Sequence, residues 1–256
     1  DTITYKRMLK DGICQVEKDK YNKTIRFFDI NYRLMEEEDQ EGIFADFFSF
    51  LNFFDSSVEV EFNYINSIGE NEERKELINI KETEDDFNEI RNEYRQMLLN
   101  QSSKGNNGLS KNMYLTFTIK AEDLKQVKSR LERIESDILN NFRQMGVKGY
   151  VLDGEERLKV IHDILNPEDR FIFNFEDLKY SGLTTKEYIV PTSFNFSKPT
   201  YFKMGEVFAE VNFLQILASD IKDEMLSEFL ALEENMVVTF HIKAIDQMEA
   251  IKNVKR

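Results

Sequence analysis

The chain has 256 residues, enough for one large domain or two small ones. Its hydrophobic share of 41%, with 22 Phe and 10 Tyr, supplies a core and argues against a disordered chain, although 32% of the residues are charged. The net charge of -14 argues against the whole chain being a surface for nucleic acid or anionic membranes, since both require concentrated Lys and Arg.

Cysteine content and hydropathy point to a cytoplasmic setting. Cys14 is the single cysteine, so an internal disulfide is impossible and nothing indicates an oxidising compartment. No apolar run approaches the roughly 20 residues that cross a bilayer, and the first residues do not resemble a signal peptide. We therefore expect no membrane insertion, and contact with a membrane only through partners or through regions outside this sequence.

The first half of the chain opens with strand-like segments. Residues 12–16 and 24–30 are rich in β-branched and aromatic side chains and predict two strands. Residues 58–65 predict a third strand, because apolar and polar side chains alternate there. Its polar face carries Glu59 and Glu61, so we expect this side of the sheet to face solvent.

An aromatic helix is predicted between the second and third of these strands. Its apolar residues follow helical spacing and form a wide face: Ile43, Phe44, Phe47, Phe48, Phe50, Leu51 and Phe54. We expect this face to pack in the core. A helix that dips into a membrane is the alternative, and the acidic run Glu36 to Asp39 argues against it.

A second helix and a glycine-containing loop are predicted next. The helix starts from an N-cap at Thr83, and its apolar residues predict a buried stripe: Phe87, Ile90, Tyr94, Met97 and Leu98. The loop contains Gly105-Asn106-Asn107-Gly108 but lacks the Gly-Lys-Ser/Thr ending whose lysine and hydroxyl hold phosphate and magnesium. No such ending occurs in the sequence. We therefore predict no nucleotide site, no metal site and no cofactor in this chain.

A long amphipathic helix and a strand complete the first half. Apolar side chains recur every three or four residues over 124–145, Gly146 is placed as a C-cap, and 147–152 predicts a strand. A coiled-coil seam is possible for this stripe, but packing across a sheet is favoured because strands flank the helix. The order of elements over 24–152 fits a ferredoxin-like α/β sandwich with an inserted helix. We take 1–152 as the first subdomain of an α/β (α+β) protein.

The second half begins with a helix and continues into an aromatic, β-rich segment. Asp153 and Glu156 predict the capped start of the helix. Helical periodicity is absent between 171 and 204, and short strands are predicted at 193–196, 200–204 and 207–217. These strands either form a small sheet packed on the first or present a docking surface, since exposed aromatics are favoured at interfaces. The candidate docking side chains are all aromatic: Tyr180, Tyr188, Phe194, Phe196 and Tyr201.

The end of the sequence repeats an earlier motif. Residues 235–244 match residues 112–121 at seven of ten positions, and a predicted helix follows each copy. We therefore expect residues 153–256 to form a second, ferredoxin-like α/β subdomain. Its last helix, over 245–256, keeps apolar spacing and meets no stop signal. We expect this subdomain to be truncated there and the polypeptide to continue.

A set of short segments is spread over nearly the whole chain: Asp11–Val16, Thr24–Tyr32, Lys104–Leu109, Arg130–Glu135, Pro191–Phe194, Phe213–Leu217 and Ile245–Lys252. Together they resemble the N-terminal region of the large conjugative-transfer ATPases of Gram-positive type IV secretion systems. This family comprises the TraE/TrsE-type relatives of the CagE, TrbE and VirB group. The segments are specific for kinship and carry no catalytic chemistry.

The resemblance implies a role in assembly for this region. The complete protein would carry a RecA-like motor domain with the phosphate loop, so ATP and Mg are expected only there. This region would seat the motor on the secretion channel, at the inner face of the cell membrane, and contact inner-membrane components and other ATPase copies. We therefore expect a non-catalytic docking and assembly domain without direct contact to nucleic acid.

Two functions of other classes remain open from the residues alone. A free-standing cytosolic enzyme would use a pocket between the two α/β units, with Glu59, Glu61 or His162 as candidate groups. His162 has no second histidine at zinc-motif spacing, which argues against a metal ligand. An acidic mimic of nucleic acid would bind a basic DNA-handling protein in a strongly salt-dependent way.

Overall fold

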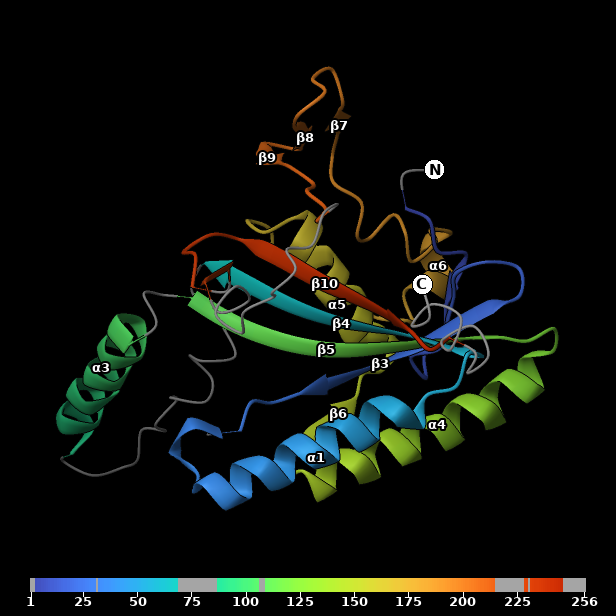
Figure 1. The fold of residues 1–256 in the computed structure, drawn as a ribbon. Coiled ribbons are helices and arrows are strands. Elements are labelled where there is room, and N and C mark those ends of the chain that lie inside the picture. The colour runs from blue at the N-terminus through green and yellow to red at the C-terminus, as the bar shows by residue number, and fades with distance from the viewer. Residues whose placement is uncertain are drawn as a thin grey trace. The chain divides into compact units, whose positions relative to one another are not determined.

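The computed structural model describes residues 3–30, 32–68, 87–105, 109–214, 228–229 and 231–245 (Figure 1). Its helices and strands are, in chain order, β1 (Arg7–Met8), β2 (Cys14–Gln15), β3 (Lys20–Phe27), the 3-10 helix η1 (Tyr32–Leu34), α1 (Glu37–Phe53), β4 (Val58–Ile68), α3 (Asn88–Gly105), β5 (Leu109–Lys120), α4 (Leu124–Gln144), β6 (Gly149–Val151), α5 (Gly154–Leu165), α6 (Leu178–Ser181), β7 (Phe194–Asn195), β8 (Phe202–Met204), β9 (Val207–Ala209) and β10 (Met236–Lys243). Helices combined with antiparallel sheets confirm the expected α+β class. The predicted N-cap at Thr83 and the predicted helix beyond residue 245 lie outside the described residues.

The chain divides into two compact units. Unit 1 comprises Asp1–Asn63, Met113–Gln215 and Thr239–Arg256, and unit 2 comprises Tyr64–Asn112 and Ile216–Val238. Each unit takes segments from both halves of the sequence. The units therefore differ from the expected division into an N-terminal and a C-terminal subdomain.

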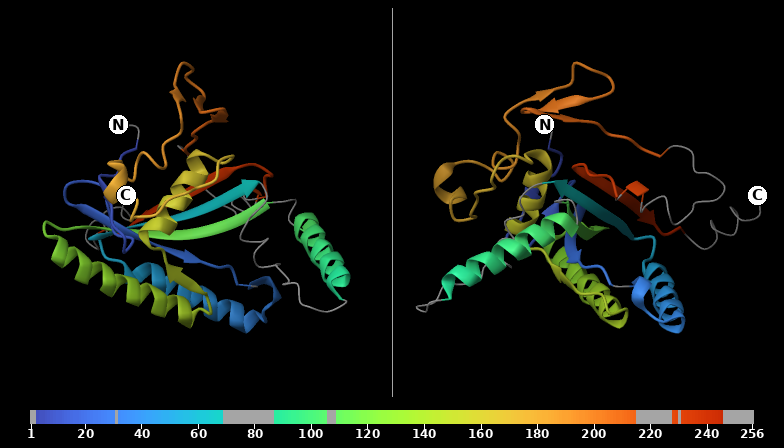
Figure 2. Two further views of the ribbon diagram at one scale, coloured as in Figure 1. Left: turned by 180° about the vertical axis from the view of Figure 1, so that it is seen from behind. Right: turned by 90° about the vertical axis from the view of Figure 1, so that its left-hand side faces the viewer.

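Unit 1 contains the predicted ferredoxin-like sandwich. The strand order is β6-β3-β5-β4, and β3 pairs antiparallel with both β5 and β6. Two β-helix-β connections that share one sheet in this way are the split βαβ arrangement. Helices α1 and α4 cover one face of the sheet, and α5 lies on the opposite face (Figures 1 and 2).

The main core of unit 1 lies beneath α4. Alternate residues of β5 are fully buried, as strand geometry requires: Leu115, Phe117 and Ile119. The buried residues of α4 are spaced three or four positions apart: Val127, Leu131, Ile134, Ile138 and Phe142. Phe142 contacts Phe27 of β3 and Phe50 of α1, with ring centroids 5.4 Å apart in each pair. The predicted packing of this helix across a sheet is confirmed.

Helix α1 buries only part of its aromatic face. Phe50 is fully buried, and Phe54 after the helix is buried beside it. Phe44, Phe47 and Phe48 are each exposed by 40% or more. The interpretation of a wholly buried aromatic face is therefore wrong, because α1 turns a single stripe toward the sheet face that it shares with α4.

Helix α3 belongs to unit 2, and its predicted stripe is not buried. Phe87, Ile90, Tyr94 and Met97 are all exposed, by 44% to 61%. The helical periodicity was correctly predicted, but the inference from periodicity to burial was wrong for these four side chains.

Strand β10 joins the same sheet as the strands of the first half, next to β4. The two copies of the repeated motif thus form β5 and β10, which flank β4 on either side. Thr239 Oγ1 donates to Asn63 Oδ1 at 2.8 Å, and His241 Nδ1 lies 3.1 Å from Glu61 Oε1. Strand β10, from the second half of the sequence, therefore shares one sheet with the strands of the first half.

Strands β2 and β6 occupy successive stretches of one edge of β3, and α5 packs where they meet. Arg157 of α5 is buried there. Its guanidinium donates to the Gly12 carbonyl at 2.6 Å, to the Asn22 carbonyl at 3.1 Å and to Asn22 Oδ1 at 2.8 Å. Burial lowers the pKa of this guanidinium. The predicted cap of α5 is confirmed, because Asp153 and Glu156 form a reciprocal capping box.

A second core joins the first strands to α5 and to the segment after it. Its buried members are Tyr5, Met8, Cys14, Leu158, Phe173 and Ile189. These residues come from both sides of position 152, which explains why the N-terminal strands and the segment after α5 fall in one unit.

Candidate docking surface

The aromatic segment forms its own three-stranded antiparallel sheet, β7-β8-β9, here called the aromatic sheet (Figure 2). Met204 pairs with Phe194 on one side and with Val207 on the other. A two-residue turn joins β8 to β9, and Gly205 adopts a φ of +54° in it, which glycine does without strain. The predicted strand 207–217 is shorter than expected, because strand structure ends at Ala209.

Alternation along the strands sorts the rings onto the two faces of the aromatic sheet. On one face, Phe196 stacks on Phe194 and on Phe202, with ring centroids 5.8 Å and 5.2 Å apart. On the other face, Tyr201 meets Phe208 edge-on at 5.7 Å. Both faces therefore carry aromatic contacts, although the sheet has only three strands.

These rings remain open to solvent. Phe208 is 68% exposed, Phe196 is 63% exposed and Tyr201 is 40% exposed. Fully burying a side chain of this size is worth about 1.5–3 kcal/mol relative to leaving it exposed. The aromatic sheet thus retains much of its capacity to bury apolar area, as protein-binding surfaces do.

Charged side chains frame one face of the aromatic sheet. The Lys203 ammonium lies 5.8 Å from the centroid of the Phe208 ring, which is within cation–π range. Lys203 Nζ also pairs with Glu206 Oε2 at 2.7 Å, and this hydrogen bond lowers the pKa of the Glu206 carboxyl. A polar rim beside aromatic rings is typical of an interface.

The aromatic sheet contains three of the five predicted docking residues, with Phe194 and Phe196 on one face and Tyr201 on the other. Tyr180 lies on the short helix α6 and is 89% exposed. Tyr188 packs against the second core, so little of its ring is available to a partner.

Sequence reasoning left Phe202 and Phe208 out of the docking set. Phe208 was assigned to the predicted strand 207–217, whereas the strand observed is Val207–Ala209 and the Phe208 ring is exposed. The alternation of side chains between the two faces of a strand could have identified both rings. Phe194, Phe196 and Phe202 share one face, whereas Tyr201 and Phe208 share the other.

Tyr5 provides a pH-dependent test of the second core. Its hydroxyl is hydrogen-bonded to Thr185 Oγ1 at 2.8 Å, and burial raises its pKa from 10.0 to about 12. The folded state therefore holds the proton more tightly than the unfolded state. Stability from this group is complete below pH 10.0 and is lost as the pH rises toward 12.

We expect Tyr5→Phe to be less stable than the wild type by about 1 kcal/mol at pH 8, because one hydrogen bond is lost. The difference in free energy of unfolding should narrow as the pH rises from 10.0 to about 12, since the unfolded wild type releases this phenol proton in that range while the folded wild type retains it. Urea unfolding across this pH range measures it. Tyr180→Phe removes a hydroxyl at an 89% exposed position and is the control, which should be as stable as the wild type at pH 8. A difference in free energy of unfolding between the wild type and Tyr5→Phe that stays constant over this pH range would contradict the burial of the Tyr5 hydroxyl.

The two acidic residues considered for catalysis each face a nitrogen-bearing side chain on the polar face of the sheet. Glu61 Oε1 lies 3.1 Å from His241 Nδ1 of β10. Glu59 Oε2 lies 3.7 Å from Lys20 Nζ. The hydrogen bond of Lys20 to Glu17, and then the charge of Glu59, raise the pKa of the Lys20 ammonium. The Glu59 and Glu61 side chains are 38% and 37% exposed, so this face of the sheet is open to solvent as expected.

His162 lies in different surroundings. It is buried on α5, and its ring is 5.1 Å from the ring of Phe171. Its Nδ1 lies 3.4 Å from the carboxylate of Asp163. Within the described part of the chain, no three His, Cys, Asp or Glu side chains gather where they could hold a metal ion.

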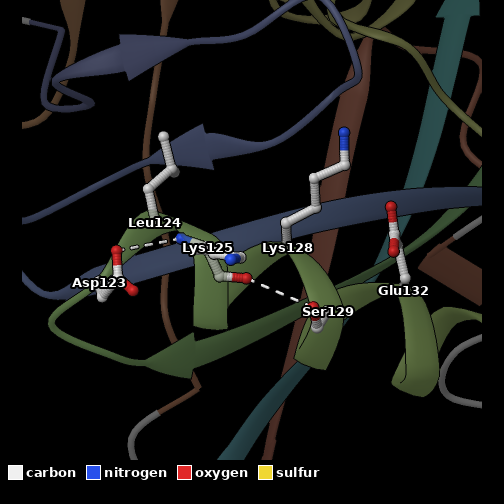
Figure 3. Close-up of a pocket in the computed structure, with 6 residues that line it drawn as sticks. All are labelled: Asp123, Leu124, Lys125, Lys128, Ser129 and Glu132. Carbon is white, nitrogen blue, oxygen red and sulfur yellow. Dashed lines mark hydrogen bonds between the residues drawn. The ribbon is translucent and has the colours of Figure 1, made fainter.

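A shallow groove of about 500 Å³ lies at the start of α4 (Figure 3). Its lining residues come from one stretch of chain: Asp123, Leu124, Lys125, Lys128, Ser129 and Glu132. Asp123 Oδ1 accepts from the Lys125 backbone N–H at 3.2 Å and caps the helix. Lys128 Nζ pairs with Asp11 at 3.3 Å. Asp123 in this groove thus caps α4, and Lys128 takes part in a surface ion pair. We assign the groove no ligand.

Comparisons with known proteins do not place the chain in a family. No protein-family model matches it, and no curated protein matches it significantly. In the described ranges, no helix combines the length and apolarity needed to cross a bilayer.

Proposed function

We propose that this chain is a non-catalytic docking and assembly domain of a conjugative-transfer ATPase of a type IV secretion system. The observation that carries the proposal is the aromatic sheet, which presents Phe196 on one face and Phe208 on the other to solvent. The resemblance of the sequence to this ATPase family supplies the class of partner. That class comprises inner-membrane components of the channel and other copies of the ATPase, met at the inner face of the membrane.

A contrast in burial between the sandwich and the aromatic sheet of unit 1 supports this function. The sandwich buries its own apolar faces beneath α4, and the second core ties the N-terminal strands to α5. The aromatic sheet has no comparable core, because its largest rings are exposed. A partner that covers both faces would supply the missing burial, and it would do so without any catalytic group on this chain.

A double substitution, Phe196→Ser with Phe208→Ser, removes one exposed ring from each face. We expect affinity for the inner-membrane channel components to fall by about 30-fold or more, since a hot-spot ring contributes about 2 kcal/mol. The free energy of unfolding should change by less than about 1 kcal/mol, because both rings are exposed in the folded chain. Binding of purified components and urea unfolding measure the two quantities.

The matched control is Ile172→Ser, which removes another exposed apolar side chain, 77% exposed and outside the aromatic sheet. It should bind like the wild type. Equal affinities for the wild type and the double variant would contradict docking through the aromatic sheet. ATP hydrolysis by the purified chain at a motor-like rate, with contamination excluded, would contradict the non-catalytic role.

A further inference from the structure

Helix α1 carries a second apolar stripe that faces away from the core. Glu37, Glu41, Phe44, Phe48 and Leu51 follow one another at spacings of four, three, four and three residues. This is the heptad spacing of a helix seam. We call these five residues the outer stripe of α1.

The outer stripe is separate from the buried stripe that contains Phe50. Phe44 is 56% exposed and Phe48 is 51% exposed, whereas Phe50 is fully buried. The rings of Phe44 and Phe48 contact each other with centroids 4.7 Å apart. They therefore form one continuous aromatic ridge, and Leu51, which is half-buried, extends it by one turn.

The charge of α1 is one-sided. Over Glu37–Phe53 the helix has five carboxylates and no basic residue: Glu37, Glu38, Asp39, Glu41 and Asp46. Two of these carboxylates continue the outer stripe at its N-terminal end. The complement of this surface is a helix whose apolar seam meets Phe44, Phe48 and Leu51 and whose basic side chains reach Glu37 and Glu41 beyond it.

The same charge distribution argues against two other occupants. A second copy of α1 would bring like charges together along the seam, which disfavours pairing. An anionic bilayer would repel the carboxylates, since helices that lie on membranes carry Lys and Arg on the polar face.

We infer that the outer stripe of α1 docks a basic amphipathic helix of another protein. Phe44 and Phe48 fill the seam of that helix, and Glu37 and Glu41 pair with its Lys or Arg residues. This site lies on a different element from the aromatic sheet and does not rest on the proposed function.

The test uses the whole chain and two synthetic helical peptides that share one Leu heptad seam. One peptide has Lys and the other has Glu at the flanking positions. The chain should bind the Lys peptide at least tenfold more tightly than the Glu peptide. Phe44→Ser with Phe48→Ser should weaken binding of the Lys peptide at least tenfold, while the unfolding midpoint stays near that of the wild type. Fluorescence anisotropy measures binding.

Charge reversal separates the site from general attraction to an acidic protein. Glu37→Lys with Glu41→Lys should weaken binding of the Lys peptide at least tenfold, whereas Glu155→Lys with Glu168→Lys, at the same net charge, should weaken it less than threefold. Equal losses for the two reversals, or unchanged binding by the Phe44 and Phe48 variant, would overturn the inference. Self-association, or binding to phosphatidylglycerol vesicles, that is lost with Phe44 and Phe48 would overturn it in favour of that occupant.

Discussion

Replacing Arg157 with methionine is expected to lower the free energy of unfolding by about 3 kcal/mol. The guanidinium bonds the carbonyls of Gly12 and Asn22 and the Asn22 side chain. Methionine fills similar space but leaves three acceptors without this donor. Each buried polar group that loses its partner costs about 1–3 kcal/mol.

The opposing effect is the desolvation of the guanidinium, which methionine avoids. We expect the lost hydrogen bonds to outweigh it, because they join three segments: the turn before β2, strand β3 and helix α5. Urea unfolding measures the change. Arg133→Met, at an exposed position of α4, is the control and should stay within about 0.5 kcal/mol of the wild type. Equal stabilities for Arg157→Met and the wild type would show that this junction contributes nothing to folding.

Gly154→Ala is expected to destabilise the chain by about 3 kcal/mol or more, although alanine is the better helix former. A Cβ on Gly154 would lie 2.1 Å from the Leu9 carbonyl oxygen and 2.8 Å from Phe175 Cζ. The Leu9 carbonyl belongs to the backbone of the N-terminal turn and cannot yield like a flexible side chain. Its movement would also strain the 3.0 Å hydrogen bond from the Gly154 N–H to the Lys10 carbonyl.

Gly42→Ala in α1 is the matched control, because among the described residues the added Cβ meets nothing within 4 Å apart from its chain neighbours and the adjacent backbone of its own helix. It should stabilise the chain by about 0.5–1 kcal/mol through helix propensity alone. Thermal unfolding of the two variants should therefore shift in opposite directions. Shifts of the same sign would contradict the close approach of the N-terminal turn to α5.

Local pattern predicted much of the sandwich. The alternation in β4, the stripe of α4 and the capping box of α5 each depend on residues close in sequence, and the structure confirms all three elements. Their order along the chain was sufficient to predict the split βαβ topology. Strands β1 and β2 have only two residues each, which is too short for an alternating pattern of apolar and polar side chains to predict them.

Long-range pairing could not be predicted. The position of β10 beside β4 depends on which sheet edge is open, and the repeated motif indicates a strand without indicating its neighbour. Which aromatic side chains are buried could not be predicted from local sequence either. Phe44 and Phe50 have the same side chain on the same helix, and only the position of the sheet decides that one is exposed and the other is buried.

Composition alone did not separate the rings of the aromatic sheet from a ring that packs in the second core. Aromatic crowding marked the segment that forms the aromatic sheet, and strand alternation brings Phe194 and Phe196 onto one face. Tyr188 has a similar composition around it, but its ring meets Phe173 at 5.0 Å because α5 and the N-terminal strands form a core there. That core depends on contacts more than 150 residues apart in sequence, such as the hydrogen bond between Tyr5 and Thr185.

Photo-crosslinking from the aromatic sheet tests the proposed docking role most directly. A photoreactive phenylalanine would replace Phe196 or Phe208 in cells that carry the complete transfer system, with Ile172 as the control position. We predict crosslinks from both sheet positions to an inner-membrane channel component or to another copy of the ATPase, and none from position 172. The absence of such products from both sheet positions, with the labelled protein present at wild-type levels, would contradict a docking domain that works through this surface.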